Sequence, residues 1–315
     1  METTLPPLGA QLAAHITRQA STQTFYTIRL LADRDRVEDA YRAYAYFRWV
    51  DDELDAERGA HAGSSEFVQR QKSLLESCYR GDSMQAGDAH EELLIDLVQH
   101  TGARKDGLQI YLHNLMAVMA FDATRRGRLI SQPELNAYTW YLASAVTEAL
   151  HYFIGHDCFS PQDGSRYMAV SGAHVTHMLR DSLDDVKAGY YNIPREVLDE
   201  YHLSASDVDT DAYRAWVKSR VNLARGYFEA GCRYLRRVRS ARCRLACFAY
   251  VSRFTGVLDA IEGDGYRLRA SYAETKGLRA LLRACTAVFA GFTDRRKDYL
   301  ASGNVSADEA PLGGR

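Results

Sequence analysis

The sequence predicts an all-α protein built as one helical domain. Proline, which breaks helices, occurs only at positions 6, 7, 133, 161, 194 and 311, so the segments 8–132 and 195–310 contain none. Within these segments apolar residues recur at helical spacing, for example over 67–75, 108–121 and 216–235. No segment alternates apolar and polar residues with β-branched enrichment, which argues against a sheet.

The expected breaks between helices are rich in glycine and serine. Loops are predicted at 59–65, 81–88, 101–107 and 156–165. Ser131 has the position of a helix N-cap because a proline and Glu134 follow it, and Pro194 begins a further segment. There is no repeat and no evident linker. We therefore expect one domain over residues 15–301, with flexible tails at 1–14 and 302–315.

Composition excludes several classes of function. Hydrophobic residues make up 46% and charged residues 25%, as in soluble globular proteins. The net charge of −2 provides no positive field for a nucleic-acid partner. No apolar run approaches the roughly 18–20 residues that span a bilayer, and the N-terminus lacks a secretory pattern. We expect a cytoplasmic protein. An arginine-rich stretch at 233–244 fits a solvated helix face, or a peripheral contact with anionic lipid.

Two segments carry acidic residues in a helical stripe. In the first, Tyr44, Arg48, Asp51 and Asp55 fall at i, i+4, i+7 and i+11, which is one face of a helix. Carboxylates one turn apart repel each other, but Mg²⁺ favours carboxylate oxygen and would reverse that cost. Taken alone, such an acidic run is more typical of a solvated surface.

The second stripe makes a metal site the better interpretation. His174, His177, Asp181 and the pair Asp184/Asp185 again share a helical face. If the two stripes face each other, their carboxylates could bind Mg²⁺ ions that hold a diphosphate. Arg48, one turn from the first pair, could contact that diphosphate directly. The competing interpretation is two unrelated exposed faces. The predicted metal ligands are Asp51, Asp55, Asp181 and Asp185.

These motifs resemble the squalene/phytoene synthase family. The run ASTQTFY at 20–26 and YAYFRWVDDELD at 44–55 are similar to the family's opening motifs. The run HMLRDSLDD at 177–185, followed by GYYNIP at 189–194, resembles its second acidic motif. Segments 138–148 and 254–266 are similar to its middle and late helices. The resemblance covers about residues 20–290.

The resemblance implies an all-α isoprenoid synthase fold with a central active-site cavity. It implies a Mg²⁺-dependent prenyl transferase that couples two farnesyl or geranylgeranyl diphosphates head to head, giving a squalene- or phytoene-like product. Catalytic roles would fall to Tyr138, Arg48, Asp51 and Asp181. Substrate contacts would come from Thr22, Thr24, Phe25, Tyr44, Arg48, Tyr138, Leu142, Val146, His174, His177 and Phe254. NADPH use stays open, because no dinucleotide-binding motif is needed for it in this family.

Several residues depart from the family pattern. His177 replaces an asparagine and His174 replaces a glutamine. An imidazole at either position could contact the diphosphate–metal cluster or form part of the pocket wall. Ser144 and Thr147 replace two glycines, and their added atoms are expected to narrow the cavity. Phe254 stands where a tyrosine is often found.

Three functions remain open on these observations. Head-to-head coupling is favoured. A terpene synthase that ionises one prenyl diphosphate is the alternative, because the departures affect the cavity wall. A non-catalytic scaffold is least favoured, since it has no need for four gathered acids. The sequence does not predict the oligomeric state.

Overall fold

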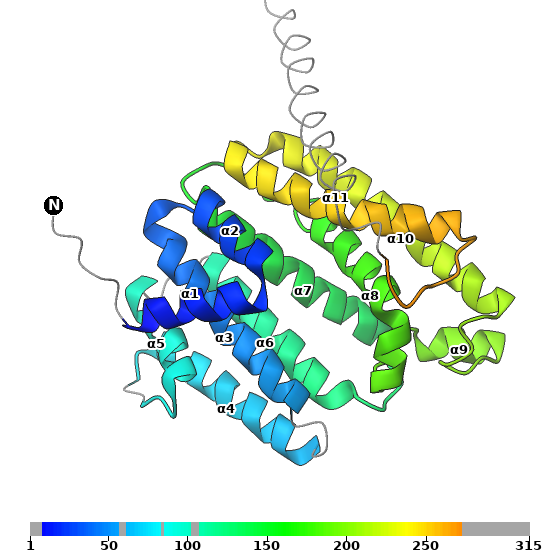
Figure 1. The fold of residues 1–315 in the computed structure, drawn as a ribbon, viewed down its shortest axis with the longest axis horizontal. Helices are drawn as coiled ribbons and strands as arrows, with labels where there is room; N and C mark the ends of the chain where they lie inside the picture. Colours follow the sequence, from blue (N-terminus) through cyan, green and yellow to red (C-terminus); the bar gives the residue numbers. More distant parts are fainter. Residues whose placement is uncertain (1–7, 57–60, 83–84, 102–106, 273–315) are drawn as a thin grey trace, which may run out of the picture.

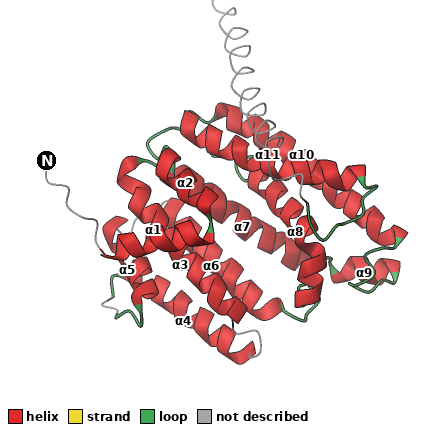
Figure 2. Cartoon of the chain, viewed as in Figure 1, coloured by secondary structure: helices red, strands yellow, loops and turns green. Residues whose placement is uncertain are grey.

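The described residues form helices joined by loops and confirm the predicted all-α fold class. The structure, a computed structural model, describes residues 8–56, 61–82, 85–101 and 107–272, and these contain no strand (Figures 1 and 2). The helices are α1 (Leu8–Ala20), α2 (Thr22–Leu31), the short 3-10 helix η1 (Arg34–Arg36), α3 (Val37–Ala56), α4 (His61–Arg80), α5 (Ala89–Thr101), α6 (Gly107–Arg125), α7 (Gln132–Phe153), α8 (Met168–Ala188), α9 (Arg195–Tyr201), α10 (Asp211–Arg237) and α11 (Ala241–Gly263).

Helix starts follow the local signals in the sequence. Ser131 caps α7 through a complete capping box: its hydroxyl accepts from the Glu134 backbone, and the Glu134 carboxylate accepts from the Ser131 backbone. Pro194 immediately precedes α9, as expected. At the C-terminal end of α8, Gly189 adopts a φ of 86°, which glycine tolerates, and the helix ends there.

The boundaries differ from the expectation at two places. Helix α1 begins at Leu8, so residues 8–14 of the expected tail are helical, and Ala10 and Ala13 are buried. Leucine and alanine favour helix formation, and α1 packs against α3. Helix α4 begins at His61, inside the segment expected as a loop. Parts of the expected loops lie outside the described residues. Residues 273–301 of the expected domain and the expected tail at 302–315 lie wholly outside them.

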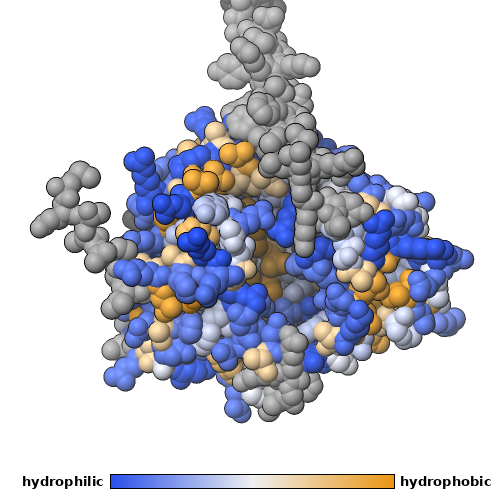
Figure 3. Space-filling model, in the orientation of Figure 1, coloured by the Kyte–Doolittle hydropathy of each residue, from blue (hydrophilic) through white to orange (hydrophobic). Residues whose placement is uncertain are grey.

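The helices that carry the acidic stripes, α3 and α8, lie in the interior of the bundle. Helix α3 packs against α1, α5 and α6, while α8 packs against α7, α10 and α11. The approach of α8 to α10 is very close: a Cβ on Gly231 would lie 2.4 Å from the Ala169 nitrogen. One face of the molecule is hollowed near its centre, with hydrophobic residues visible inside a hydrophilic surround (Figure 3). None of the helices described here is both long and apolar enough to cross a membrane.

Candidate active site

The two acidic stripes meet at one cavity. Its volume is about 260 Å³, and residues of α3, α6, α7, α8 and the segment after α8 line it. The lining residues are Asp51, Leu54, Asp55, Asp122, Arg125, Tyr138, His174, His177, Met178, Asp181, Asp185, Tyr190 and Asn192. All four predicted metal ligands are among them. The arrangement gives the cavity an acidic rim together with aromatic and apolar wall residues.

On α3, Asp51 lacks a dedicated cationic partner. Its Oδ2 lies 3.2 Å from Nη1 of Arg48, but the same guanidinium binds Asp52 through Nε at 3.0 Å and through a second contact. The pKa of Asp51 is raised to about 6, chiefly by burial, which outweighs the opposing effect of Arg48 and is assisted by the nearby carboxylates Asp55 and Asp122. The α3 side of the cavity therefore has excess negative charge.

On α8, Asp181 is fully compensated. Arg180 donates to its two oxygens at 2.6 and 2.7 Å, and Nε2 of His177 lies 2.7 Å from Oδ2. Burial raises the pKa of Asp181, but these contacts outweigh it, so the net pKa lies well below its usual range. Asp185 differs: burial and the neighbouring Asp181 raise its pKa to about 6, although Asn192 donates to it at 2.7 Å.

A buried polar network forms the cavity wall between α6 and α7. Arg125 donates to Asp122 at 2.6 Å and to Asn192 at 2.8 Å, and its guanidinium lies 4.9 Å from the ring centres of Tyr138 and Tyr190. The Tyr138 hydroxyl donates to Asp122 at 3.0 Å. Burial raises the pKa of Asp122 despite Arg125.

The sequence motifs did not point to this network. Asp122 and Arg125 stand three residues apart where the apolar pattern of α6 ends, which is the one local signal they give. Their partners are far away along the chain, since Asn192 is 67 residues from Arg125. The chemistry of the pair appears only when the helices are assembled.

The two histidines of α8 differ in environment. His174 is 4% exposed and packs edge-on against Tyr138, with ring centroids 5.0 Å apart. His177 has a half-exposed side chain, contacts Asp181, and has its ring 6.3 Å from that of Phe254. Of the two, His177 is therefore beside an acid and His174 is in the aromatic wall.

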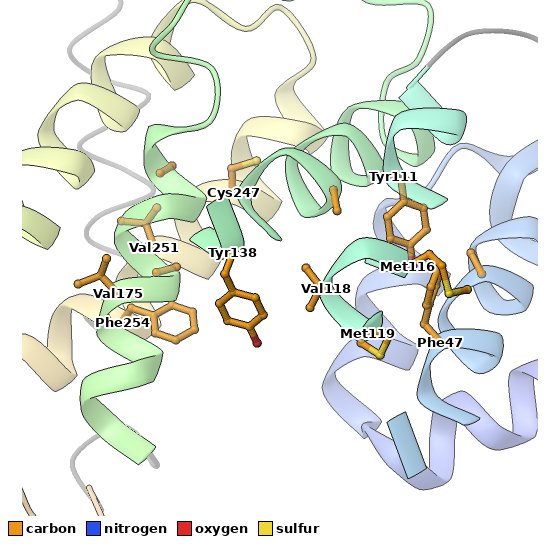
Figure 4. Close-up of a cluster of buried hydrophobic side chains, with 14 of the residues drawn as sticks. Phe47, Tyr111, Met116, Val118, Met119, Tyr138, Val175, Cys247, Val251 and Phe254 are labelled. Carbon is orange, nitrogen blue, oxygen red and sulfur yellow. The ribbon is translucent and has the colours of Figure 1, made fainter. Parts of the chain in front are cut away.

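Several predicted substrate contacts do not line this cavity. The Thr24 hydroxyl donates to Ser21 at 2.9 Å, and Phe25 stacks on Tyr41 with centroids 5.3 Å apart. Phe254 is buried in the core on α11, and in Figure 4 the Tyr138 ring projects toward the space between Phe254 and Met119. Substrate roles for these residues stay predictions. The other predicted contacts absent from the lining are Thr22, Tyr44, Arg48, Leu142 and Val146.

The expected narrowing of the cavity by Ser144 and Thr147 is not seen. Both are buried on α7, and neither lines the described cavity. Ser144 lies at the interface with α6 instead, where its hydroxyl accepts from Asn114 at 2.8 Å and donates to the Trp140 carbonyl at 2.7 Å. The Ser144 hydroxyl therefore lies between α6 and α7. A glycine at this position would let the two helices pack more closely.

The donor set suits a hard divalent cation. Among the described residues, no three acidic, histidine or cysteine side chains converge tightly enough to hold an ion by themselves. Mg²⁺ does not require such a cage, because it is commonly held by one or two carboxylates, waters and the oxygens of a bound phosphate. Asp51 and Asp185, whose charges the protein compensates only in part, fit a site that is completed by cations and substrate.

Comparisons with known proteins agree with this geometry. The family model described as squalene/phytoene synthase matches residues 18–281. A 15-cis-phytoene synthase from Synechocystis is 25% identical over 291 residues, covering 86% of this chain and 83% of that protein. A chloroplastic phytoene synthase from Narcissus pseudonarcissus is 26% identical over 274 residues, covering 82% of this chain and 62% of that protein.

Solved structures share the fold. A dehydrosqualene synthase superposes with a TM-score of 0.68 at 15% identity, covering 93% of this chain and 97% of that one. A squalene synthase from Alicyclobacillus acidocaldarius gives a TM-score of 0.65 at 18% identity, covering 83% and 95%. The family resemblance drawn from the motifs is thus confirmed. This chain belongs to the squalene/phytoene synthase family, whose members are prenyltransferases that join two prenyl diphosphates head to head.

Proposed function

We propose that this protein binds two prenyl diphosphates in the described cavity and couples them head to head with release of diphosphate. The observation that carries the proposal is that both aspartate pairs line the same cavity as Tyr138, beside apolar side chains such as Leu54 and Met178. Acids suit the metal-bound diphosphate, and the apolar wall suits the prenyl chains. A scaffold would gain nothing from holding four carboxylates in one cavity at the expense of their hydration.

Mg²⁺ is the cofactor that we assign to the acids. Asp51 and Asp55 would hold it from α3, and Asp181 and Asp185 from α8. When bound, the ions neutralise the charge that develops on the departing diphosphate. Use of NADPH stays open, and the experiment below, run with and without NADPH, tests it.

Tyr138 is positioned to stabilise the carbocation left by ionisation. Its ring faces the cavity, and the negative face of an aromatic ring attracts a cation. The hydroxyl donates to the Asp122 carboxylate, which fixes the ring and increases its electron density. Asp122 is in turn held by Arg125, so the aromatic wall is braced from α6.

Peripheral membrane contact is proposed through Leu30 and Phe159, which lie beside part of the arginine-rich stretch, rather than through the stretch as a whole. Several of those arginines bind the chain itself: Arg244 donates to the carbonyls of Val238 and Arg239, and Arg242 to those of Leu31 and Ala32. Leu30 and Phe159, by contrast, are 68% and 62% exposed, and Arg239 lies 5.6 Å from the Phe159 ring. Exposed apolar residues beside arginines suit an anionic bilayer surface. Vesicle flotation of L30S and F159S tests this contact, and unchanged binding argues against it.

Product mass tests the reaction directly. The protein is incubated with farnesyl or geranylgeranyl diphosphate and Mg²⁺, with and without NADPH, and D51N serves as the control variant. A product containing two prenyl units supports coupling, whereas a one-unit alcohol or cyclic product supports the alternative terpene synthase. Absence of any Mg²⁺-dependent diphosphate release from either substrate would refute both.

A further inference from the structure

His174 is a buried polar side chain that nothing in the described protein satisfies. Only 4% of the residue is exposed, and neither Nδ1 nor Nε2 has a hydrogen-bond partner among the described residues. The ring nevertheless lines the cavity. Leaving a buried polar group unpaired costs about 1–3 kcal/mol, so a residue with no role would be better replaced by an apolar one. This points to a partner that arrives with the substrate.

The imidazole is neutral and therefore has a free lone pair. Burial is the main cause that lowers the pKa of His174 to about 3, with smaller contributions from His177, Arg125 and Arg220. Two neighbouring candidates for the base are already engaged, and the other acids of the cavity are assigned to the cations. Arg180 and His177 occupy the carboxylate of Asp181, and Tyr138 uses its proton to bind Asp122.

Head-to-head coupling requires a base, and this requirement follows from its atom balance. In each of its two steps a C–O bond breaks, and diphosphate leaves with the bonding electrons. In the first step the cation adds to the C=C bond of the second substrate, whose π bond breaks, and the electrons of a C–H bond close a cyclopropane ring as a proton is lost. In the second step one bond of that ring breaks as the new carbon–carbon bond forms, which leaves a second carbocation. In the absence of a hydride donor, electrons from an adjacent C–H bond must quench that cation, so each step releases one diphosphate and one proton. The proton of the product-forming step must go to a base that lies in the cavity.

We propose that His174 is that base in the product-forming step, with the consequence that the hydrocarbon is released unreduced. The inference rests on the proposed coupling reaction. A C–H bond next to a carbocation is far more acidic than an imidazolium, so a weakly basic imidazole still accepts its proton. The buried imidazolium is itself unstable, and it passes the proton on to the departing diphosphate. The edge-on contact with Tyr138 places the base beside the aromatic ring assigned to hold the cation.

The test is the ratio of hydrocarbon to diphosphate in H174Q. Glutamine is similar in size and polar, but its amide does not accept a proton. General-base catalysis contributes roughly 10²–10⁴-fold, so we expect hydrocarbon formed per diphosphate released to fall by about 100-fold. Diphosphate release itself should stay within a few-fold of the unmodified protein, and the trapped cation should appear as an alcohol. Substrate deuterated at C1 should show a primary isotope effect on this partition.

H177Q is the matched control, because His177 contacts Asp181 at the acidic rim. It should slow diphosphate release and leave the ratio unchanged. If His174 had a merely structural role, H174Q would lower hydrocarbon formation and diphosphate release together, and their ratio would not change. An unaltered ratio therefore overturns the proposal. If H174Q does not fold, H174A with added imidazole replaces it, and rescue of the ratio is expected; failure of rescue in folded H174A also overturns it. Failure of the coupling reaction itself is recognised separately, by the unmodified protein releasing no diphosphate.

Discussion

Replacing Asp51 by asparagine should stabilise the protein while it abolishes diphosphate release. Burial raises the pKa of Asp51 from its usual 3.8 to about 6. The folded state then binds more protons than the unfolded state between pH 4 and 6, so stability falls as pH rises through that range. A shift of this size corresponds to roughly 3 kcal/mol of unfolding free energy at pH 7. Because 47% of the side chain is exposed, screening reduces the expected gain in D51N to about 1.5 kcal/mol.

The assay is urea unfolding at pH 7.5 and pH 4, with EDTA present and substrate absent. The gain should be present at pH 7.5 and fall to a few tenths of a kcal/mol by pH 4, where the carboxyl is protonated in the folded state and about half protonated in the unfolded state. D52N is the matched control, because Asp52 binds Arg48 and does not line the cavity. It should lose a few tenths of a kcal/mol at most. A D51N protein less stable than the unmodified one at pH 7.5, or a gain that is undiminished at pH 4, would refute the electrostatic reasoning.

Three further predictions concern Asp181, Asn192 and Ser144. D181N should lose about 1 kcal/mol of unfolding free energy above pH 4, the opposite sign to D51N, because Arg180 and His177 stabilise the charged carboxylate; no loss in urea unfolding contradicts this. N192A removes a hydrogen bond to Asp185, so the pKa of that acid should rise and the acidic limb of the pH profile for diphosphate release should move upward, whereas an unmoved limb counts against it. S144G should cost about 2 kcal/mol, from the lost Asn114 contact and a helix-interior glycine, and leave preference for substrate chain length unchanged; a shift toward longer substrates would restore the narrowing hypothesis.

Local signals made most of the fold predictable. The capping box at Ser131 and the proline before α9 involve residues within a few positions of each other, so their physics is visible in the sequence. The acidic stripes were predictable for the same reason, because helical spacing alone fixes which side chains share a face. The start of α1 at Leu8 differs from the expected tail because packing against α3 stabilises this helix, and that contact is not visible in the local sequence.

The parts that were not predictable depend on contacts between helices. The face of α7 that carries Ser144 could be named from the sequence, but whether it meets substrate or α6 depends on packing that a single helix does not encode. The same holds for Asp122 and Arg125, whose partners come from α7 and from the segment after α8. Sequence spacing identifies which residues share a helix face, and only assembly decides what that face contacts.

The two acidic pairs illustrate the difference most clearly, because both are spaced D-x-x-x-D and yet their leading aspartates have opposite electrostatics. Asp181 follows directly after Arg180, which donates to both of its oxygens and keeps it charged. Asp51 has Arg48 one turn earlier, but that guanidinium also binds Asp52, which leaves the cavity-facing acid undercompensated. One carboxylate is therefore balanced by the protein, whereas the other has a charge that a cation in the cavity would balance. The shared motif indicates that both aspartates bind cations, and the neighbouring residues determine how much of each aspartate's charge the protein itself balances.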